Sequence, residues 1–170
     1  LKTWTAPAAD MFDGRGFYAA KSAGDGEKRY LFGWIPTKTN DRDQGGWEWG
    51  GSLAVHELYQ RPDGTLGVRA PAQREAAFTE EAASDTLTVR GTSGRTEEIG
   101  AMPHTYLLRC TLEGDFARAG FAVAHSAAAG YRYVVDTQNN TFSFENYPSA
   151  DLFGDVTVPV APAQAYEIVL

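Results

Sequence analysis

The chain is built from short segments in which apolar residues tend to occupy every second position, with residues that favour turns between the segments. Neighbouring side chains of a strand point to opposite faces, so this alternation predicts β-strands with one buried face. From residue 86 onward we expect strands at 86–90, 104–112, 120–125, 131–136, 141–145, 156–160 and 166–170. Regular short strands with turn signals between them predict an antiparallel β-sandwich.

The first half of the chain predicts strands of a different kind. We expect strands at 17–21, 28–35, 52–60 and 66–69, a long polar loop at 37–46 and a short helix at 71–79. Tyr30, Phe32 and Trp34 share one face of the second strand. The opposite face of the same strand carries Leu31 and Ile35. Because both faces are largely apolar, this strand is expected to be buried on both sides.

The charge and hydropathy of the chain argue against two classes of partner. The 170 residues carry a formal net charge of −7, and the sequence pI is near 4.9. An acidic surface repels the phosphates of nucleic acids. The longest apolar runs, such as residues 30–35, are too short to span a bilayer. We therefore expect neither a nucleic-acid partner nor a membrane partner.

Cysteine and histidine give no sign of a metal or cofactor site. Cys110 is the single cysteine, which rules out an internal disulfide and a cysteine-based metal site. His56, His104 and His125 are widely separated and lack the spacing of zinc ligands. We therefore expect no metal and no cofactor. No signal peptide is present at Leu1, which leaves both a bacterial cytoplasmic and a secreted protein open.

Four motifs between residues 13 and 58 occur in the order found in one family of glycosidases. They are Asp13-Gly14-Arg15-Gly16-Phe17-Tyr18-Ala19-Ala20-Lys21, Arg29-Tyr30-Leu31-Phe32-Gly33-Trp34, Trp47-Glu48-Trp49-Gly50-Gly51-Ser52-Leu53 and His56-Glu57-Leu58. In these motifs the chain resembles glycoside hydrolase family 32, the invertases, levanases, inulinases and related β-fructosidases. Val55 and His56 stand where the family usually has Pro-Arg, which points to a divergent branch.

The resemblance implies a fold and a division of the chain. The family has a five-bladed β-propeller that holds the active site, followed by a β-sandwich. Residues 1–46 would then be a remnant of the final propeller blade with its linker loop, and residues 47–170 an incomplete sandwich domain. The expected fold class is all-β: an antiparallel, jelly-roll-like or concanavalin-like sandwich preceded by propeller strands.

The chain lacks the family's catalytic carboxyl groups. Hydrolysis with retention of configuration uses two such groups, a nucleophile and an acid/base. In the family these lie in an Asn-Asp-Pro-Asn segment and a Glu-Cys pair, with a third in Arg-Asp-Pro. Asn40-Asp41-Arg42 and Arg42-Asp43-Gln44 lack the proline, and Arg109 rather than a glutamate precedes Cys110. We therefore expect no catalytic residue in this chain, and hydrolysis by its parent protein.

The resemblance suggests Trp34 and Asp13 as residues beside the substrate. The indole of Trp34, at the end of a propeller strand, could stack on the apolar face of a sugar ring, or pack between blade and sandwich. Asp13 could border the same cleft, or only form a turn before Gly14. Trp47 and Trp49 share one face of an extended segment, where they either hold a sugar or anchor a loop.

Two functions remain open at this point. In the first, the chain is the C-terminal part of a family 32 hydrolase that acts on β-fructosidic bonds of sucrose, inulin or levan. Its partners are then a fructose-containing oligosaccharide or sucrose, and the propeller domain of the same protein, which the sandwich supports. In the second, the chain is a non-catalytic carbohydrate-binding β-sandwich module.

Overall fold

A computed structural model gives the fold of the protein. It describes residues 3, 6–7, 11–14, 16–42, 45–81, 86, 88, 98, 100–123, 130–147 and 156–170. About half of these residues lie in strands, and the antiparallel sheets do not close into a barrel, which confirms the all-β class. Among the described residues no helix is long and apolar enough to cross a membrane.

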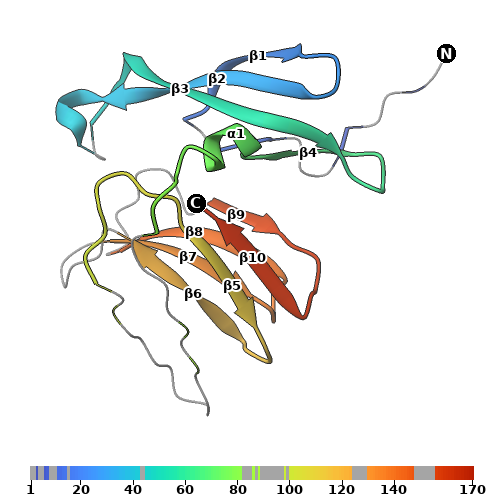
Figure 1. Cartoon of the computed structure of the whole chain (residues 1–170), viewed down its shortest axis with the longest axis vertical. Coiled ribbons are helices and arrows are strands. Elements are labelled where there is room, and N and C mark those ends of the chain that lie inside the picture. The colour runs from blue at the N-terminus through green and yellow to red at the C-terminus, as the bar shows by residue number, and fades with distance from the viewer. Residues whose placement is uncertain are drawn as a thin grey trace.

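The first four strands form one sheet, which we call the N-terminal sheet (Figure 1). They are β1 (Tyr18–Gly24), β2 (Arg29–Lys38), β3 (Trp47–Gln60) and β4 (Leu66–Arg69). Each strand pairs antiparallel with the next one along the chain. The sheet is therefore a meander in the order β1-β2-β3-β4. The 3-10 turn η1 (Thr39–Asp41) follows β2.

Turns built on aspartate join these strands. Between β1 and β2, the Asp25 carboxylate accepts hydrogen bonds from the backbone N–H groups of Glu27 and Lys28, at 3.0 and 2.7 Å. Between β3 and β4, the Asp63 carboxylate accepts one from the Thr65 N–H at 2.9 Å. These side-chain bonds satisfy backbone donors that have no ladder partner in a turn, so the chain reverses within a few residues.

One face of the N-terminal sheet leaves large apolar side chains in solvent. We call it the open face; it carries Tyr18, Phe32, Trp34, Trp49 and Leu53. The exposed fraction is 38% for Phe32, 72% for Leu53 and 84% for Trp49. Side chains of this size are normally covered in a finished domain.

The opposite face of the N-terminal sheet is covered around Leu31 and Gly33, whereas Ile35 on the same face is 43% exposed. Leu31 is only 8% exposed on this face. Gly33 is buried beneath the ring of Phe17, and a Cβ atom at Gly33 would come within 2.4 Å of that ring. A glycine is needed here because the ring lies directly on the backbone.

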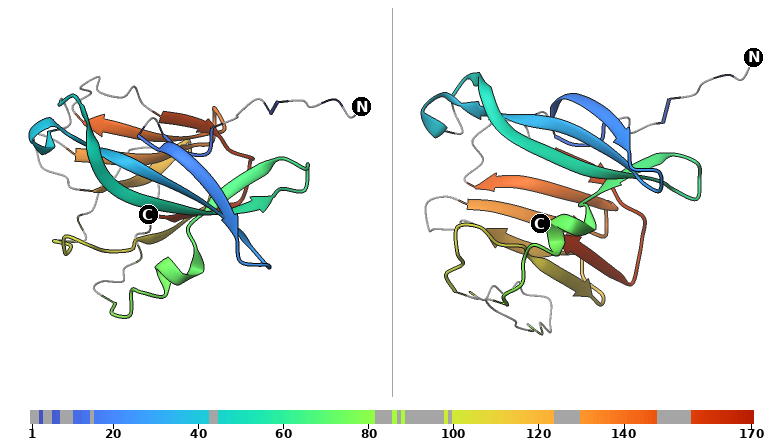
Figure 2. Two further views of the ribbon diagram at one scale, coloured as in Figure 1. Left: turned by 90° about the horizontal axis from the view of Figure 1, so that it is seen from above. Right: turned by 45° about the horizontal axis from the view of Figure 1, so that its top comes forward.

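The remaining strands form two further sheets. They are β5 (Arg109–Glu113), β6 (Arg118–Val123), β7 (Gly130–Asp136), β8 (Thr141–Tyr147), β9 (Val156–Pro159) and β10 (Ala165–Val169). β6, β7, β8 and β9 pair in this order, and β5 pairs with β10. Figure 1 shows β5 and β10 in front of β6–β9, and Figure 2 shows these sheets below the N-terminal sheet in its right view.

The core of this C-terminal region is one face of the four-stranded sheet. The ring centroids of Phe121 and Tyr133 lie 5.2 Å apart, and those of Tyr131 and Phe144 lie 5.6 Å apart. Val135, on the same face, is 1% exposed. Stacked aromatic neighbours across strands contribute to the stability of the sheet in addition to the area that they bury.

The other face of the same sheet is polar. Arg118 forms ion pairs with Glu145 at 2.8 Å and with Asp136 at 3.7 Å. The Ser143 hydroxyl donates a hydrogen bond to Glu145 at 3.0 Å. One apolar and one polar face is the pattern of a sandwich layer, so the C-terminal region is sandwich-like.

A short helix and an arginine connect the two regions. Helix α1 (Ala72–Glu75) follows β4 and lies within the expected helix at 71–79. Arg109 of β5 forms an ion pair with Glu75 of this helix at 2.5 Å. The same guanidinium pairs with Glu167 of β10. Arg109 therefore joins the helix to the β5–β10 sheet.

Most strands lie near where the sequence predicts them, but β5 begins at Arg109 instead of residue 104, and β3 begins at Trp47 instead of residue 52. Two glycines, Gly50 and Gly51, make the start of this strand look like a turn. In the structure Gly51 pairs with Pro36, and a Cβ atom at Gly51 would come within 2.2 Å of the Ile35 carbonyl oxygen. The strand expected at 86–90 lies outside the described residues except for its positions 86 and 88.

The strand pairing bears on the division expected between residues 46 and 47. β3 and β4 follow that boundary, yet they pair with β2, which precedes it, and with each other. The N-terminal sheet therefore continues to Arg69. The domain limits stay a prediction.

Candidate functional site

Three aromatic side chains of the open face lie against one another, and we call them the aromatic platform. The rings of Trp34 and Trp49 are stacked, with centroids 6.1 Å apart and an interplanar angle of 29°. The Tyr18 ring meets both of them edge-on, at 5.8 Å from Trp34 and 6.4 Å from Trp49. Offset-stacked and edge-on contacts are both favourable for aromatic rings, so the platform is held together without a covering layer.

A cavity of about 260 Å³ lies at the platform. Its lining residues are Tyr18, Trp34, Pro36, Trp47, Glu48 and Trp49. Glu48 is the one charged residue in this lining, and its carboxylate lies 3.4 Å from the Thr37 hydroxyl. Small-molecule pockets usually begin at roughly 300 Å³, so this one suits a ligand of about one ring.

A β-bulge in β1 turns Tyr18 toward the platform. Tyr18 lies opposite Trp34 and Lys21 lies opposite Phe32, so β1 has one residue more than β2 over this stretch. In a regular strand, Tyr18 and Lys21 would point to opposite faces because they are three positions apart. The bulge, where Ala19 has a φ of +52°, brings both to the open face.

Trp47 and Trp49 line the same cavity from positions of β3 that are two residues apart. The Lys38 ammonium lies 4.4 Å from the centre of the Trp47 ring, a cation–π contact. Trp49 is far more exposed than Trp47, at 84% against 47%. The part of the platform most accessible to a ligand is therefore the Trp49 ring.

Asp13 lies on the other side of the sheet. One oxygen of its carboxylate accepts a hydrogen bond from the Gly14 N–H at 2.6 Å, which is the turn anticipated from the sequence. The other oxygen lies 2.7 Å from Nε2 of His56, whose ring packs edge-on against Phe17. Asp13 does not line the cavity beside Trp34, so the structure does not bring these two expected site residues together.

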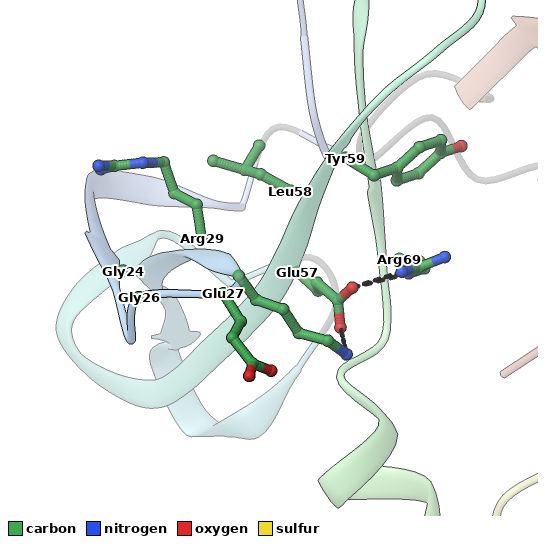
Figure 3. Close-up of a pocket in the computed structure, with 9 residues that line it drawn as sticks. Gly24, Gly26, Glu27, Arg29, Glu57, Leu58, Tyr59 and Arg69 are labelled. Carbon is green, nitrogen blue, oxygen red and sulfur yellow. Dashed lines mark hydrogen bonds and ion pairs between the residues drawn. The ribbon is translucent and has the colours of Figure 1, made fainter.

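A group of charged side chains lies at the other end of the open face, and we call it the Glu57 cluster. Glu57 is only 3% exposed although it is acidic. One carboxylate oxygen accepts a hydrogen bond from the Lys28 ammonium at 2.8 Å. The other accepts two from the Arg69 guanidinium, one of them from Nε at 3.1 Å (Figure 3). Two cations thus share one buried carboxylate.

The contacts in the Glu57 cluster change the acidity of all three groups. The hydrogen bonds from Lys28 and then from Arg69 hold the pKa of the Glu57 carboxyl below its usual value of 4.5. The same bonds raise the pKa of Lys28 and of Arg69. All three side chains are therefore charged throughout the neutral pH range.

Two residue types that often carry chemistry do not form a site here. Burial raises the pKa of the Cys110 thiol, so the reactive thiolate is disfavoured. In the part of the chain that the structure describes, no three His, Cys, Asp or Glu side chains gather where they could hold a metal ion. His125 and Asp43, considered from the sequence, lie outside that part.

The sequence indicates some residues of the platform cavity and misses others. Trp34, Trp47 and Trp49 stand out as tryptophans near strand ends, and they meet at one cavity. Tyr18 does not stand out, because the bulge in its strand reverses the face that simple alternation predicts for it. Glu48 does not stand out either, because a single carboxylate between two tryptophans resembles any solvated residue.

The platform is suited to binding rather than to bond cleavage. A retaining glycosidase needs two carboxyl groups about 5–5.5 Å apart, whereas Glu48 is the one carboxylate in the lining of this cavity. Exposed indole faces can instead contact the apolar face of a sugar ring, and the neighbouring carboxylate can accept a hydrogen bond from a sugar hydroxyl. Comparisons of the chain with models of known protein families and with curated protein sequences find no match.

Proposed function

We propose that this chain is the C-terminal part of a glycoside hydrolase similar to family 32, which cleaves β-fructosidic bonds in sucrose, inulin or levan. The N-terminal sheet would be the final blade of the catalytic propeller, and the sandwich-like C-terminal region would support it. The four motifs between residues 13 and 58 suggest the family. The structural observation that carries the proposal is the open face.

The open face supports a role in packing against another domain. Contiguous exposed apolar residues mark interaction sites, and Trp49 and Leu53 are 84% and 72% exposed. Propeller blades are four-stranded sheets arranged radially, so each has a neighbour on both faces. The N-terminal sheet has four antiparallel strands in meander order and apolar residues on both faces. The propeller of the same protein is the proposed cover of the open face.

The platform supports a place for Trp34 beside the substrate. Trp34 projects from the open face and stacks on Trp49, instead of packing on the covered face with Leu31. Its side chain is therefore available at the surface that would meet the propeller. In this proposal the indole contacts a fructosyl ring, while the catalytic carboxyl groups come from the propeller strands of the parent protein.

The amino-acid sequence of the intact protein before Leu1 is the first test. It should contain an Asn-Asp-Pro-Asn segment, a Glu-Cys pair and an Arg-Asp-Pro segment. The intact protein should release fructose from at least one of sucrose, inulin and levan. An intact protein that lacks these segments and releases fructose from none of the three would overturn the proposal.

The role of Trp34 is tested in the intact protein. Trp34→Ala should lower kcat/KM about 2- to 10-fold, because an aromatic contact contributes about 0.5–1.5 kcal/mol. Phe32→Leu is the matched control: Phe32 lies on the same face but does not line the platform cavity. An equal loss of kcat/KM in both variants would show that the effect comes from the packing of the sheet and not from Trp34.

The second candidate, a carbohydrate-binding module, is favoured by the cavity that the three tryptophans line. If the platform binds sugar without a propeller, the 170-residue chain should bind inulin, levan or sucrose in a calorimetric titration. Trp49→Ala should then abolish the heat of binding, since Trp49 is the most exposed residue of the platform. No heat with any of the three sugars would exclude the module and leave the hydrolase proposal.

A further inference from the structure

The Glu57 cluster lies at a cavity of its own. This cavity has a volume of about 550 Å³ and lies between the β1–β2 turn, the end of β3 and Arg69 of β4 (Figure 3). It shares no lining residue with the platform cavity. It is therefore a separate candidate site on the same sheet.

A surplus of positive charge remains at the centre of this cavity. Lys28 and Arg69 are bonded to the two oxygens of one carboxylate, so two cations lie side by side. Such close like charges repel each other. Glu57 balances one of them and leaves one positive charge, in a chain whose formal net charge is −7.

The other charged residues that line the cavity do not remove this surplus. They are one acid, Glu27, and one base, Arg29, whose charges offset each other. Figure 3 shows the Arg29 side chain directed away from Glu57, and its guanidinium donates a hydrogen bond to the Ser22 hydroxyl at 3.0 Å. The lining as a whole therefore keeps one net positive charge.

Both cations retain donors for a ligand. An ammonium has three N–H groups and a guanidinium has five. The bonds to Glu57 use one N–H of Lys28 and two of Arg69. The side chains of Lys28 and Arg69 are 38% and 59% exposed, so a ligand can reach them from solvent.

We propose that this cavity binds a small anion through a phosphate or carboxylate group, held by Lys28 and Arg69. The anion would lie on the far side of the two cations from Glu57. An anion with one negative charge would then balance the positive charge that Glu57 leaves on Lys28 and Arg69. The guanidinium suits this role because its parallel N–H groups match two oxygens of a carboxylate or phosphate. Glu57 is a positioning residue that keeps the two cations together. The proposal does not depend on the sugar-binding role of the platform.

Thermal unfolding of the 170-residue chain in three sodium salts tests the proposal. Phosphate, acetate and chloride are compared at one pH and one ionic strength, which separates site binding from general screening. A bound anion at ten times its Kd should raise the Tm by about 3–6 °C above the chloride value. A rise in phosphate alone assigns the site to phosphate groups, and a rise in acetate alone assigns it to carboxylates.

Three variants locate the effect. Lys28→Met should remove the anion-dependent rise, and Lys28→Arg should keep it. Arg61→Met is the matched control and should also keep it: like Arg69, Arg61 lies over the Tyr59 ring, at 5.9 against 5.4 Å, but it does not line the cavity. Lys28 lies in the β1–β2 turn, and Arg69 still bonds Glu57 when Lys28 is replaced; circular dichroism checks that each variant is folded.

Two results would overturn the proposal. The first is a Tm in phosphate and in acetate that does not exceed the Tm in chloride. The second is a Lys28→Met variant that responds like the unchanged chain, or an Arg61→Met variant that loses the response as fully as Lys28→Met. Calorimetric titration of phosphate into the same variants gives a second measurement, because it reports binding directly.

Discussion

The N-terminal sheet and the four-stranded C-terminal sheet differ in how many of their faces carry large apolar side chains. In the four-stranded C-terminal sheet, Tyr133 and Phe144 share one face, while Arg118 and Glu145 pair on the other. In the N-terminal sheet the two faces both carry large apolar side chains. A sheet with one apolar face is completed by one partner layer, whereas a sheet with two needs a layer on each side. Judged by the described residues, the C-terminal four-stranded sheet therefore needs one covering layer and the N-terminal sheet needs two.

The largest effect in this comparison is expected from the core of the C-terminal region. Val135→Ala should lower the free energy of unfolding by about 2–3 kcal/mol, because it removes two methyl groups from a site that is 1% exposed. Val158→Ala is the matched control, since Val158 is 42% exposed in the same sheet and should lose less than about 0.5 kcal/mol. Urea unfolding measures both. Equal losses would mean that this region has no closed core.

A pH-dependent effect is expected next, from the Glu57 cluster of the N-terminal sheet. The pKa of Glu57 is lower in the folded chain than its usual 4.5, so its contacts stabilise the fold above that pH. This contribution should be lost as the pH falls from 4.5 through the folded pKa. Glu57→Gln should flatten the acid side of the stability profile, measured by urea unfolding between pH 7 and pH 3. An unchanged acid slope would contradict the role of the cluster.

At the open face we expect a smaller change in the free energy of unfolding, together with a large change in dye binding and self-association. Trp49→Ser combined with Leu53→Ser should change the free energy of unfolding by less than about 1 kcal/mol, because both residues are exposed. It should strongly reduce the binding of a dye that fluoresces on apolar surfaces, and reduce self-association in light scattering. Phe121→Ser, in the C-terminal core, should instead destabilise the fold. If the unchanged chain were monomeric and bound none of the dye, the open face would not be exposed in solution, and the comparison would fail.

The smallest effect is expected where the two regions meet. Arg109→Ala removes the ion pairs with Glu75 and Glu167, but the Arg109 side chain is half exposed and such pairs contribute little in water. The Tm should fall by no more than about 2 °C. Glu113→Ala, a charged residue of the same strand, is the control. A much larger fall for Arg109→Ala alone would mean that the two regions unfold as one unit.

Much of the fold is predictable from the sequence because its signals are local. The alternation that defines β4 and the Asp-Gly turn before it lie within a few residues, and the expected strand at 66–69 has the observed bounds. The start of β3 is not predictable in this way. Gly51 belongs to a turn by its residue type, and only the approach of the Ile35 backbone explains why a strand needs glycine there.

The candidate sites are less predictable because they join residues that are distant in the sequence. Lys28 and Arg69 lie 29 and 12 positions from Glu57, and no local pattern relates them. The three tryptophans are recognisable by type, but their meeting with Tyr18 depends on a bulge. The resemblance to family 32 directs attention to Trp34, and although Glu57 lies in the matched motif His56-Glu57-Leu58, that motif gives no sign of its partners Lys28 and Arg69.

The two outer strands of the N-terminal sheet limit how copies of this molecule can join. β1 is bent by the bulge at Ala19, and β4 has only four residues. Bent or short edge strands are poor templates for an added strand, and many proteins avoid edge-to-edge aggregation in this way. Molecules should therefore associate through their open faces and not by adding strands at the edges of the sheet. Such association should give small, soluble assemblies that separate on dilution.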